Sequence, residues 1–333
     1  IVKGMKVDKK GTNWKFISGK LLSNQSYELQ LISDDRPIYK PWKLKTFPSP
    51  NADVKNVSFI SFTCTGGPEG FRSSGKEFFK PIKFRQKIFA EGLSKKPDFA
   101  ISIGDHIYWD LRGENSPPVG RNSKFIKFFL GSYISLVYGK FNRLEGASSS
   151  TNEKVLKKLG NEQIASLYGT KFKSTPIFFI PDDHDYFEND DAEEKLVTFP
   201  ADKFSKDIFR KMADLFYPPL LDTPDGKPRR NIGRIRYGKA FEGLMADCAG
   251  NMTLGNKKAV LISNEDEKWL LTRIKESKTK HLAFIPSHPF GYTAGKWREW
   301  YPDVVAKEGT TGTVVSELLS GTSGLLTTNA NKY

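Results

Sequence analysis

The sequence contains few cysteines and no long apolar run, and both shortages limit the kind of protein that it can encode. Its two cysteines, Cys64 and Cys248, allow at most one disulfide. Both follow apolar, strand-like segments, so a small scaffold stapled by disulfides is excluded, and Cys248 is expected to be an inert buried thiol. The longest uncharged apolar run, residues 128–138, is too short to span a bilayer.

Acidic residues are also in the minority. The 38 Asp and Glu residues face 52 Lys and Arg residues, which gives a net charge of +14. A field of this sign attracts anions such as phosphate esters, polyphosphate, nucleic acid or an anionic surface, although a solvated surface position is the plainer explanation for most individual lysines. No RNP-like, helix-turn-helix or zinc-finger signature is present, so specific nucleic-acid recognition is not predicted.

The apolar pattern divides the 333-residue chain into two parts. Residues 1–50 alternate apolar and polar side chains in short runs between turn residues, which predicts a small N-terminal all-β domain, an Ig/Fn3-like antiparallel sheet or sandwich. Residues 48–51 form a plausible linker. Residues 51–333 alternate strand and helix patterns and predict an α/β domain, with an insertion at about 111–175. Within it, residues 124–141 could be a lid, a membrane-surface patch or, by default, a packed helical subdomain.

The second part contains several recognisable strands and helices. Apolar runs predict strands at 57–64, 99–103, 177–180 and 282–285, and a strand pair within 235–247. Helical spacing predicts helices at 81–96, at 204–216 and after Asn264, which with Glu267 resembles a capped helix start.

Two of these strands end in clusters of ionisable side chains. The run 177–180 should stop at Pro181, and Asp-Asp-His-Asp follows at 182–185. The run 99–103 is followed in the same way by Gly-Asp-His-Ile-Tyr-Trp-Asp at 104–110. Ligands of open α/β sheets bind outside the carboxyl ends of the strands, so both clusters are expected to share one site. So many carboxylates cost heavily in desolvation and repulsion unless a cation neutralises them, and we therefore predict a metal site.

The other strand ends add possible ligands to this site. Each donor alone has a plainer explanation, because a Gly-Asp after a strand is usually a turn, a lone Cys or Tyr usually packs in a core, and the Ser-His-Pro at His288 could be a capped turn. Together they could hold two ions that activate water and clamp the oxygens of a phosphoryl group, and a Tyr with an Asp points to ferric iron more than to zinc. The candidate residues are Cys64, Asp105, Tyr108, Asp182, Asp183, His184, His288 and possibly Asp247.

These motifs resemble those of a known family. Gly-Asp-His-Ile-Tyr at 104–108 resembles the Gly-Asp-x-x-Tyr motif of PhoD-type alkaline phosphatases, whose spacing is also seen in purple acid phosphatases. Asp-Asp-His-Asp at 182–185, with Asn-Asp at 189–190, looks like the family's Asp-Asp-His-Glu motif, and Cys64 matches its metal-binding Cys. Later blocks at Leu244–Cys248 and Trp297–Pro302 extend the resemblance over most of residues 40–303.

The resemblance implies a metallophosphoesterase fold, with a two-sheet core flanked by helices behind the small N-terminal β domain. It implies that Cys64, Asp105 and Tyr108 hold Fe³⁺ and that Asp105 bridges to divalent ions such as Ca²⁺, with Zn²⁺ or Mn²⁺ as alternatives. Asp183 takes the place of a metal-binding Asn, and His184 that of the His that contacts the phosphate and protonates the leaving oxygen. Asp105 and His184 are thus the expected catalytic residues, and the expected metal ligands are Cys64, Asp105, Tyr108, Asp182, Asp183 and His288.

Two features depart from the family pattern. Its last motif, Gly-Asp-x-His, has no counterpart after His288, and residues 304–312 are too short to contain it. We expect a segment to be absent there rather than a degraded second metal site, because residues 313–321 still resemble the strand that should follow. The family's Asp-x-Arg is Asp-Cys-Ala at 247–249, which removes a possible phosphate-binding Arg.

The sequence therefore predicts a phosphoric monoester or diester hydrolase that uses a metal-activated hydroxide on an anionic phosphate-ester substrate. The main alternative is a non-catalytic protein of the same fold that binds phosphate polymers or anionic surfaces, and a weaker one is a calcium-stabilised adhesion module. The resemblance favours an extracytoplasmic location, periplasmic or secreted, although the given chain shows no signal peptide. The oligomeric state is left open.

Overall fold

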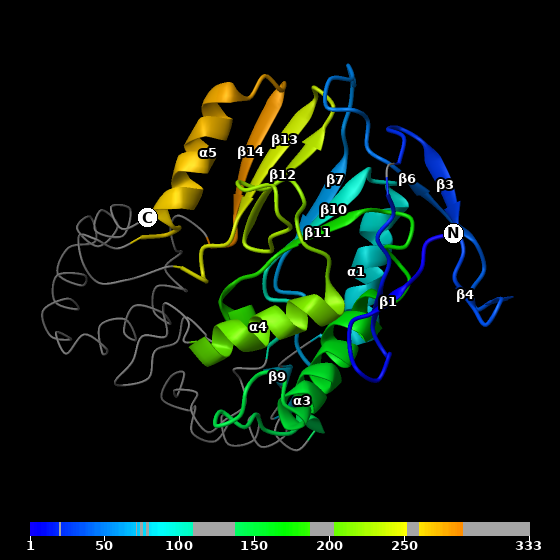
Figure 1. Cartoon of the computed structure of the whole chain (residues 1–333), viewed down its shortest axis with the longest axis vertical. Coiled ribbons are helices and arrows are strands. Elements are labelled where there is room, and N and C mark those ends of the chain that lie inside the picture. Colours follow the sequence, from blue (N-terminus) through cyan, green and yellow to red (C-terminus); the bar gives the residue numbers. More distant parts are fainter. Residues whose placement is uncertain are drawn as a thin grey trace, which may run out of the picture.

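The structure is a computed structural model of the whole chain (Figure 1). It describes residues 1–19, 21–70, 72–73, 76–77, 80–108, 137–186, 203–251 and 260–288.

Two three-stranded sheets form the centre of the molecule (Figure 1). The first is parallel and has the order β11-β10-β7. The second has the order β12-β13-β14, in which β12 is antiparallel and β14 parallel to β13. Every strand predicted for residues 51–288 is present, although β7 is shorter than the predicted 57–64. The strands are β7 (Phe59–Phe62), β10 (Phe99–Ile103), β11 (Ile177–Ile180), β12 (Ile232–Tyr237), β13 (Phe241–Ala246) and β14 (His281–Pro286).

The side chains of β10 show how the layers pack. Phe99 and Ile101 belong to a core cluster that also contains Phe241 of β13, so the two sheets pack face to face. Ala100 points to the opposite face, as alternate residues of a strand do, and belongs to a second cluster formed largely by helices. Leu270 of α5 (Asn264–Glu276) covers the outer face of the second sheet. The fold is thus mixed α/β, a two-sheet core flanked by helices, as predicted.

The other helices are α1 (Ile82–Ser94), α3 (Ser150–Gly160) and α4 (Lys203–Phe216), with a π-helical turn at Asn161–Ser166 and a 3₁₀ turn at Asp183–Tyr186. The predicted helices at 81–96 and 204–216 are confirmed. At α5 the cap lies one residue earlier than predicted: Ser263, not Asn264, is the N-cap, and its hydroxyl accepts a hydrogen bond from the Asp266 backbone N–H at 3.1 Å. Within the described ranges, no helix is both long and apolar enough to cross a bilayer.

Residues 1–50 are all-β and antiparallel, as predicted, but they form three separate two-stranded sheets. The pairs are β1 (Met5–Lys6) with β2 (Trp14–Lys15), β3 (Ser26–Leu29) with β6 (Trp42–Lys45), and β4 (Ile32–Ser33) with β5 (Arg36–Pro37). Isolated two-stranded ribbons are marginally stable, so they depend on contacts with the rest of the chain. A further short pair, β8 (Arg72–Ser73) with β9 (Lys76–Glu77), follows β7.

Ionic, polar and aromatic contacts join this N-terminal segment to the main body. The buried carboxylate of Asp8 pairs with Lys157 of α3, and the Phe47 ring packs against Phe99 and Tyr237 at centroid distances of 5.4 and 5.1 Å. A domain boundary near residue 50 stays a prediction.

The C-terminal part of the predicted insertion is a packed helical unit. α3 and the π-helical turn place Leu156, Leu159 and Ile164 in the core cluster that covers the first sheet. The expected packed helical subdomain concerned residues 124–141, and it stays a prediction because residues 109–136 lie outside the described residues.

Candidate metal centre

The loops that follow β7 and β10 have an unusual backbone where two predicted ligands lie. Cys64 and Asp105 both adopt positive φ angles, 54° and 55°. Few non-glycine residues adopt this region, and those that do often lie at functional sites. Gly104 precedes Asp105 with φ of 69°, and a Cβ there would lie 2.2 Å from Cβ of Asp182. Glycine therefore allows the loops after β10 and β11 to touch.

Asp105 lies at the centre of the first group of donors. Its Oδ2 accepts hydrogen bonds from the Cys64 thiol and the Tyr108 hydroxyl, each at 3.1 Å. Its Oδ1 is buried and has no hydrogen-bond partner. A buried carboxylate oxygen without a donor is costly in a native protein, and an oxygen in this situation fits a bound cation.

The pKa values of the groups around Asp105 also show how costly it is to bury these ionisable side chains without a cation. Burial raises the pKa of Asp105 well above its usual range, and the neighbouring Asp183 carboxylate adds to this rise against the opposing effect of His184. Burial also raises the pKa of Tyr108 well above 10. The pKa of the Cys64 thiol is raised to about 11 by burial and by the Asp105 carboxylate. A bound cation would lower these pKa values, because it favours the ionised forms of its ligands.

The structure brings most of the predicted ligands into two overlapping groups. Possible ligand atoms of Asp105, Asp183 and His184 lie within 4.8 Å of one another, and so do those of Asp182, Asp183 and His288. Asp183 is the residue that the two groups share. Bridging by Asp105 stays a prediction, and the geometry adds Asp183 as a second residue able to join two ions.

His184 is close to the metal ligands rather than remote from them. It belongs to the first group, and its ring lies 4.2 Å from the Tyr108 ring, centroid to centroid. In this position the imidazole could bind an ion or face a substrate bound to one. Its role as an acid stays a prediction.

His288 is hydrogen-bonded through Nδ1 to Oδ1 of Asp182, and both residues are buried. His288 therefore joins the second sheet to the ligand loop of the first, because it follows β14 directly. Burial raises the pKa of Asp182 to about 7 despite the opposing effect of His288. A second-sheet histidine paired with a buried carboxylate fits a ligand site better than a capped turn.

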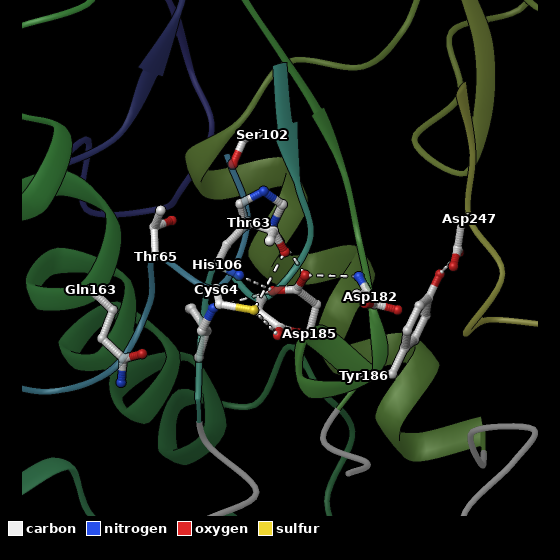
Figure 2. A network of polar contacts seen from close by, with 12 residues as sticks. Thr63, Cys64, Thr65, Ser102, His106, Gln163, Asp182, Asp185, Tyr186 and Asp247 are labelled. Atoms are coloured by element: carbon white, nitrogen blue, oxygen red, sulfur yellow. Dashed lines mark hydrogen bonds and ion pairs between the residues drawn. The ribbon is translucent and has the colours of Figure 1, made fainter. Parts of the chain in front are cut away.

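Asp247 belongs to neither group, but it lies close enough to the second one for its carboxylate to raise the pKa of Asp182. Its carboxylate accepts hydrogen bonds from the Tyr186 hydroxyl and from the Gly250 backbone N–H, the latter at 3.0 Å (Figure 2). Burial raises the pKa of Asp247 to about 7. The neighbouring Cys248 is a buried free thiol, as predicted, and burial raises its pKa to about 12.

Two residues that shape the site were not singled out by the sequence. The buried Asp185 carboxylate accepts hydrogen bonds from backbone N–H groups of the β10 loop and of its own loop, and Figure 2 shows it between His106 and Asp182. The buried Arg85 of α1 donates to the carbonyls of residues 65–68, directly after Cys64. The only signal for Asp185 was its place in the motif at 182–185, and Arg85 resembles any other basic residue of a helix.

Several predictions fall on other parts of the chain. Residues 110, 189–190, 297–302 and 304–321 lie outside the described residues, so the corresponding motif assignments and the expected missing segment stay predictions.

The donor set suits hard and borderline cations. Carboxylates, a phenol and imidazoles are the usual ligands of Ca²⁺, Mn²⁺, Zn²⁺ and iron, and a thiol adds a softer donor. A bound cation would give the Asp105 Oδ1 a partner and would offset the cost of burying these carboxylates in their ionised form. The two acidic and histidine groups could therefore hold metal ions.

Comparison with solved structures then places the fold. The chain superposes on the structure of PhoD with a TM-score of 0.55 over 95% of its length, at 14% sequence identity. The chain has a metallophosphatase-type fold similar to that of PhoD. It spans 61% of the PhoD chain, and at this identity the likeness shows the fold alone.

A weaker likeness connects the chain to a purple acid phosphatase isolated from seeds of yellow lupin (Lupinus luteus). The TM-score is 0.41 at 15% identity, over 83% of this chain and 38% of the lupin chain, too low to support an argument. No protein-family model and no curated protein sequence matches the chain.

Proposed function

We propose that the protein is a metal-dependent phosphoric ester hydrolase. The observation that carries this proposal is the pair of overlapping ligand groups, joined by Asp183, at the strand ends of a PhoD-like fold. Carboxylates and histidines from both sheets meet there, where α/β folds usually bind their ligands. The motifs at 104–108 and 182–185 resemble those of PhoD-type alkaline phosphatases, and the same class of reaction fits this site.

The ligand residues would be divided between two ions. Asp105 and Asp183 with Tyr108 and Cys64 would hold one, and Asp182, Asp183 and His288 the other, while His184 lies next to the first ion. Two such ions would supply Lewis acidity and an acidified water. We propose Fe³⁺ with Ca²⁺, on the grounds of the Tyr108 phenol and the oxygen-rich donor set, with Zn²⁺ or Mn²⁺ as alternatives.

The protein's own side chains would bind and orient the ester. The net charge of +14 attracts an anionic substrate. His184 stands beside Tyr108 at the edge of the first group and is only partly buried. From there its imidazole would donate a proton to the leaving oxygen, a contribution of about 10²–10⁴-fold. An extracytoplasmic setting, where calcium is abundant, is the location that we propose.

Metal analysis combined with turnover of p-nitrophenyl phosphate and bis-p-nitrophenyl phosphate tests the proposal. We expect about two ions per chain by the count of ligand groups, and turnover of at least one ester that chelators abolish. Retention of phosphate or polyphosphate without turnover would instead support the non-catalytic binding protein. Absence of both metal and turnover would overturn the proposed function.

A further inference from the structure

The chain between α3 and β11 contains a short π-helical turn, Asn161–Ser166, that continues α3 directly. π-Helical turns are rare, and they occur often at functional sites because the extra residue redirects side chains. The side chain of Gln163, in this turn, is completely buried. A buried amide needs several hydrogen-bond partners, so the contacts of Gln163 indicate the structural role of the turn.

Both partners of the Gln163 oxygen belong to loops that carry predicted metal ligands. Oε1 accepts a hydrogen bond from the Gly67 backbone N–H at 2.7 Å and another from the Tyr108 backbone N–H at 2.8 Å. Gly67 lies three positions after Cys64, and Tyr108 is itself a predicted ligand. One oxygen atom therefore ties together the two loops that bring a thiol and a phenol to Asp105. In Figure 2, Gln163 lies beside Thr65 and across Cys64 from Asp182.

The same turn holds the Cys64 loop at a second point. Glu162, the neighbour of Gln163, accepts a hydrogen bond from the Glu69 backbone N–H at 2.9 Å. From the opposite side, Arg85 binds the carbonyls of residues 65–68. The N–H groups of Gly67 and Glu69 thus face the π-helical turn, and the carbonyls of residues 65–68 face α1. Of these anchors, Gln163 also reaches the β10 loop.

The hydrogen-bond lengths show that the Gln163 oxygen forms stronger contacts than its nitrogen. Nε2 donates to the Tyr108 carbonyl at 3.4 Å, near the limit for a hydrogen bond, whereas the two bonds to Oε1 are short. The acceptor oxygen is therefore the important atom. A glutamate preserves this oxygen and a methionine of similar size removes it.

We infer that Gln163 is a positioning residue that sets the distance between Cys64 and Tyr108 and so shapes the thiol–phenol half of the metal centre. The inference rests on the proposed function as far as metal binding is concerned. The tie between the two loops can be measured on the metal-free protein, independently of any activity.

The first test is amide hydrogen exchange of the metal-free wild type and of Gln163→Met. Loss of one hydrogen bond of ordinary net strength should raise exchange roughly fivefold or more within residues 64–70 and 104–108, with β12 and β13 unchanged. Gln163→Glu should restore protection. Gln86→Met is the matched control, because Gln86 donates to the Ser166 carbonyl at the end of the same turn but does not contact either loop through that bond. If Gln163→Met does not fold, Gln163→Asn, which retracts the amide by one methylene, replaces it.

The second test is titration with Co²⁺, whose thiolate-to-cobalt absorption reports ligation by Cys64. We expect Gln163→Met to weaken cobalt binding and this absorption, and Gln163→Glu and Gln86→Met to resemble the wild type. Unchanged exchange in both loops, equal acceleration throughout the chain, or no rescue by Gln163→Glu would overturn the inference. A wild type that binds no cobalt would count against the proposed metal centre, and the exchange results would still decide the positioning role.

Discussion

Asp185 and His106 are joined twice. The His106 backbone N–H donates to Oδ1 of Asp185 at 2.9 Å, and the ring Nδ1 of His106 lies 3.1 Å from Oδ2. Both side chains are fully buried. The same carboxylate accepts the backbone N–H groups of Ile107 and Asp182 at 3.2 and 3.0 Å. A single side chain therefore fixes the β10 loop against the β11 loop, which together supply most of the predicted ligands.

Replacing this carboxylate should loosen both loops. Asp185→Asn retains the shape but turns one acceptor into a donor, which leaves a buried N–H or ring nitrogen unsatisfied at a cost of about 1–3 kcal/mol. Urea unfolding should show this loss, and metal content should fall with it. Asp207→Asn is the control, because among the described residues Asp207 forms its ion pairs with Lys203 and Arg210 at the surface and should lose less than about 1 kcal/mol. Equal losses in the two variants would contradict the role of Asp185.

Metal stoichiometry should distinguish the residue that joins the two ions. Asp183 belongs to both ligand groups and Asp105 to the first. We therefore expect Asp183→Ala to lose both ions and Asp182→Ala to lose one, as measured by elemental analysis of the purified variants. If Asp105→Ala loses both ions while Asp183→Ala keeps one, Asp105 is the bridging ligand that the family resemblance implies.

The Tyr108 hydroxyl should give the protein a colour if ferric iron is bound. A phenol ligand on Fe³⁺ produces a visible charge-transfer band, so Tyr108→Phe should abolish or strongly shift it while the fold persists. Tyr237→Phe is the matched control, because the Tyr237 hydroxyl donates to Asp98 at 2.6 Å and lies outside both ligand groups. A colourless wild type that contains only zinc would remove the iron assignment and leave the proposed hydrolase activity intact.

His184 should be tested by the choice of leaving group. If its imidazole protonates the departing oxygen, His184→Ala should lower kcat for alkyl phosphates by about 10²–10⁴-fold and affect nitrophenyl esters much less. His281→Ala, at the exposed start of β14, is the control. His184 also belongs to the first ligand group, so metal content must be measured in parallel. Loss of metal together with equal loss on both ester types would make His184 a ligand instead of an acid.

Stability of the metal-free protein should fall as the pH rises towards 7. Asp182 and Asp247 have folded pKa values of about 7, raised mainly by burial, whereas unfolded carboxyls titrate near 4. Between these values the folded state binds more protons than the unfolded state, so the free energy of unfolding decreases with increasing pH. Each unit by which folding raises a carboxyl pKa lowers the free energy of unfolding by about 1.4 kcal/mol at a pH above the folded pKa.

Denaturant unfolding from about pH 4 to 8 measures this slope, which Asp247→Asn should reduce. A divalent cation such as Mn²⁺ favours the ionised carboxylates of the ligand groups and should oppose the trend, most strongly near neutral pH. A metal-free protein whose stability increases over this interval would contradict the raised pKa values.

The strands of the two central sheets and the helices α1, α4 and α5 followed from local sequence patterns, because burial on both faces produces apolar runs and burial on one face of a helix produces periodic ones. The helix α3 and the β8–β9 pair were not predicted. The sequence also indicated the acidic and histidine residues at 105 and 182–184 that the structure brings together, since consecutive carboxylates after a buried strand are hard to explain without a cation. The N-terminal segment was less predictable. Its strands of two to four residues form three ribbons, and their packing is set by distant partners such as Lys157 and Phe99.

Only the tertiary structure decided how the ligands are arranged. It joined His288 of the second sheet to Asp182 of the first, and it made Asp183 common to both ligand groups. It also revealed Asp185 and Gln163, whose contacts reach loops 55 to 96 positions away in the chain. A local pattern records which side chains a segment offers, but a hydrogen bond between remote loops depends on how sheets, turns and helices pack, and that information is distributed over the whole chain.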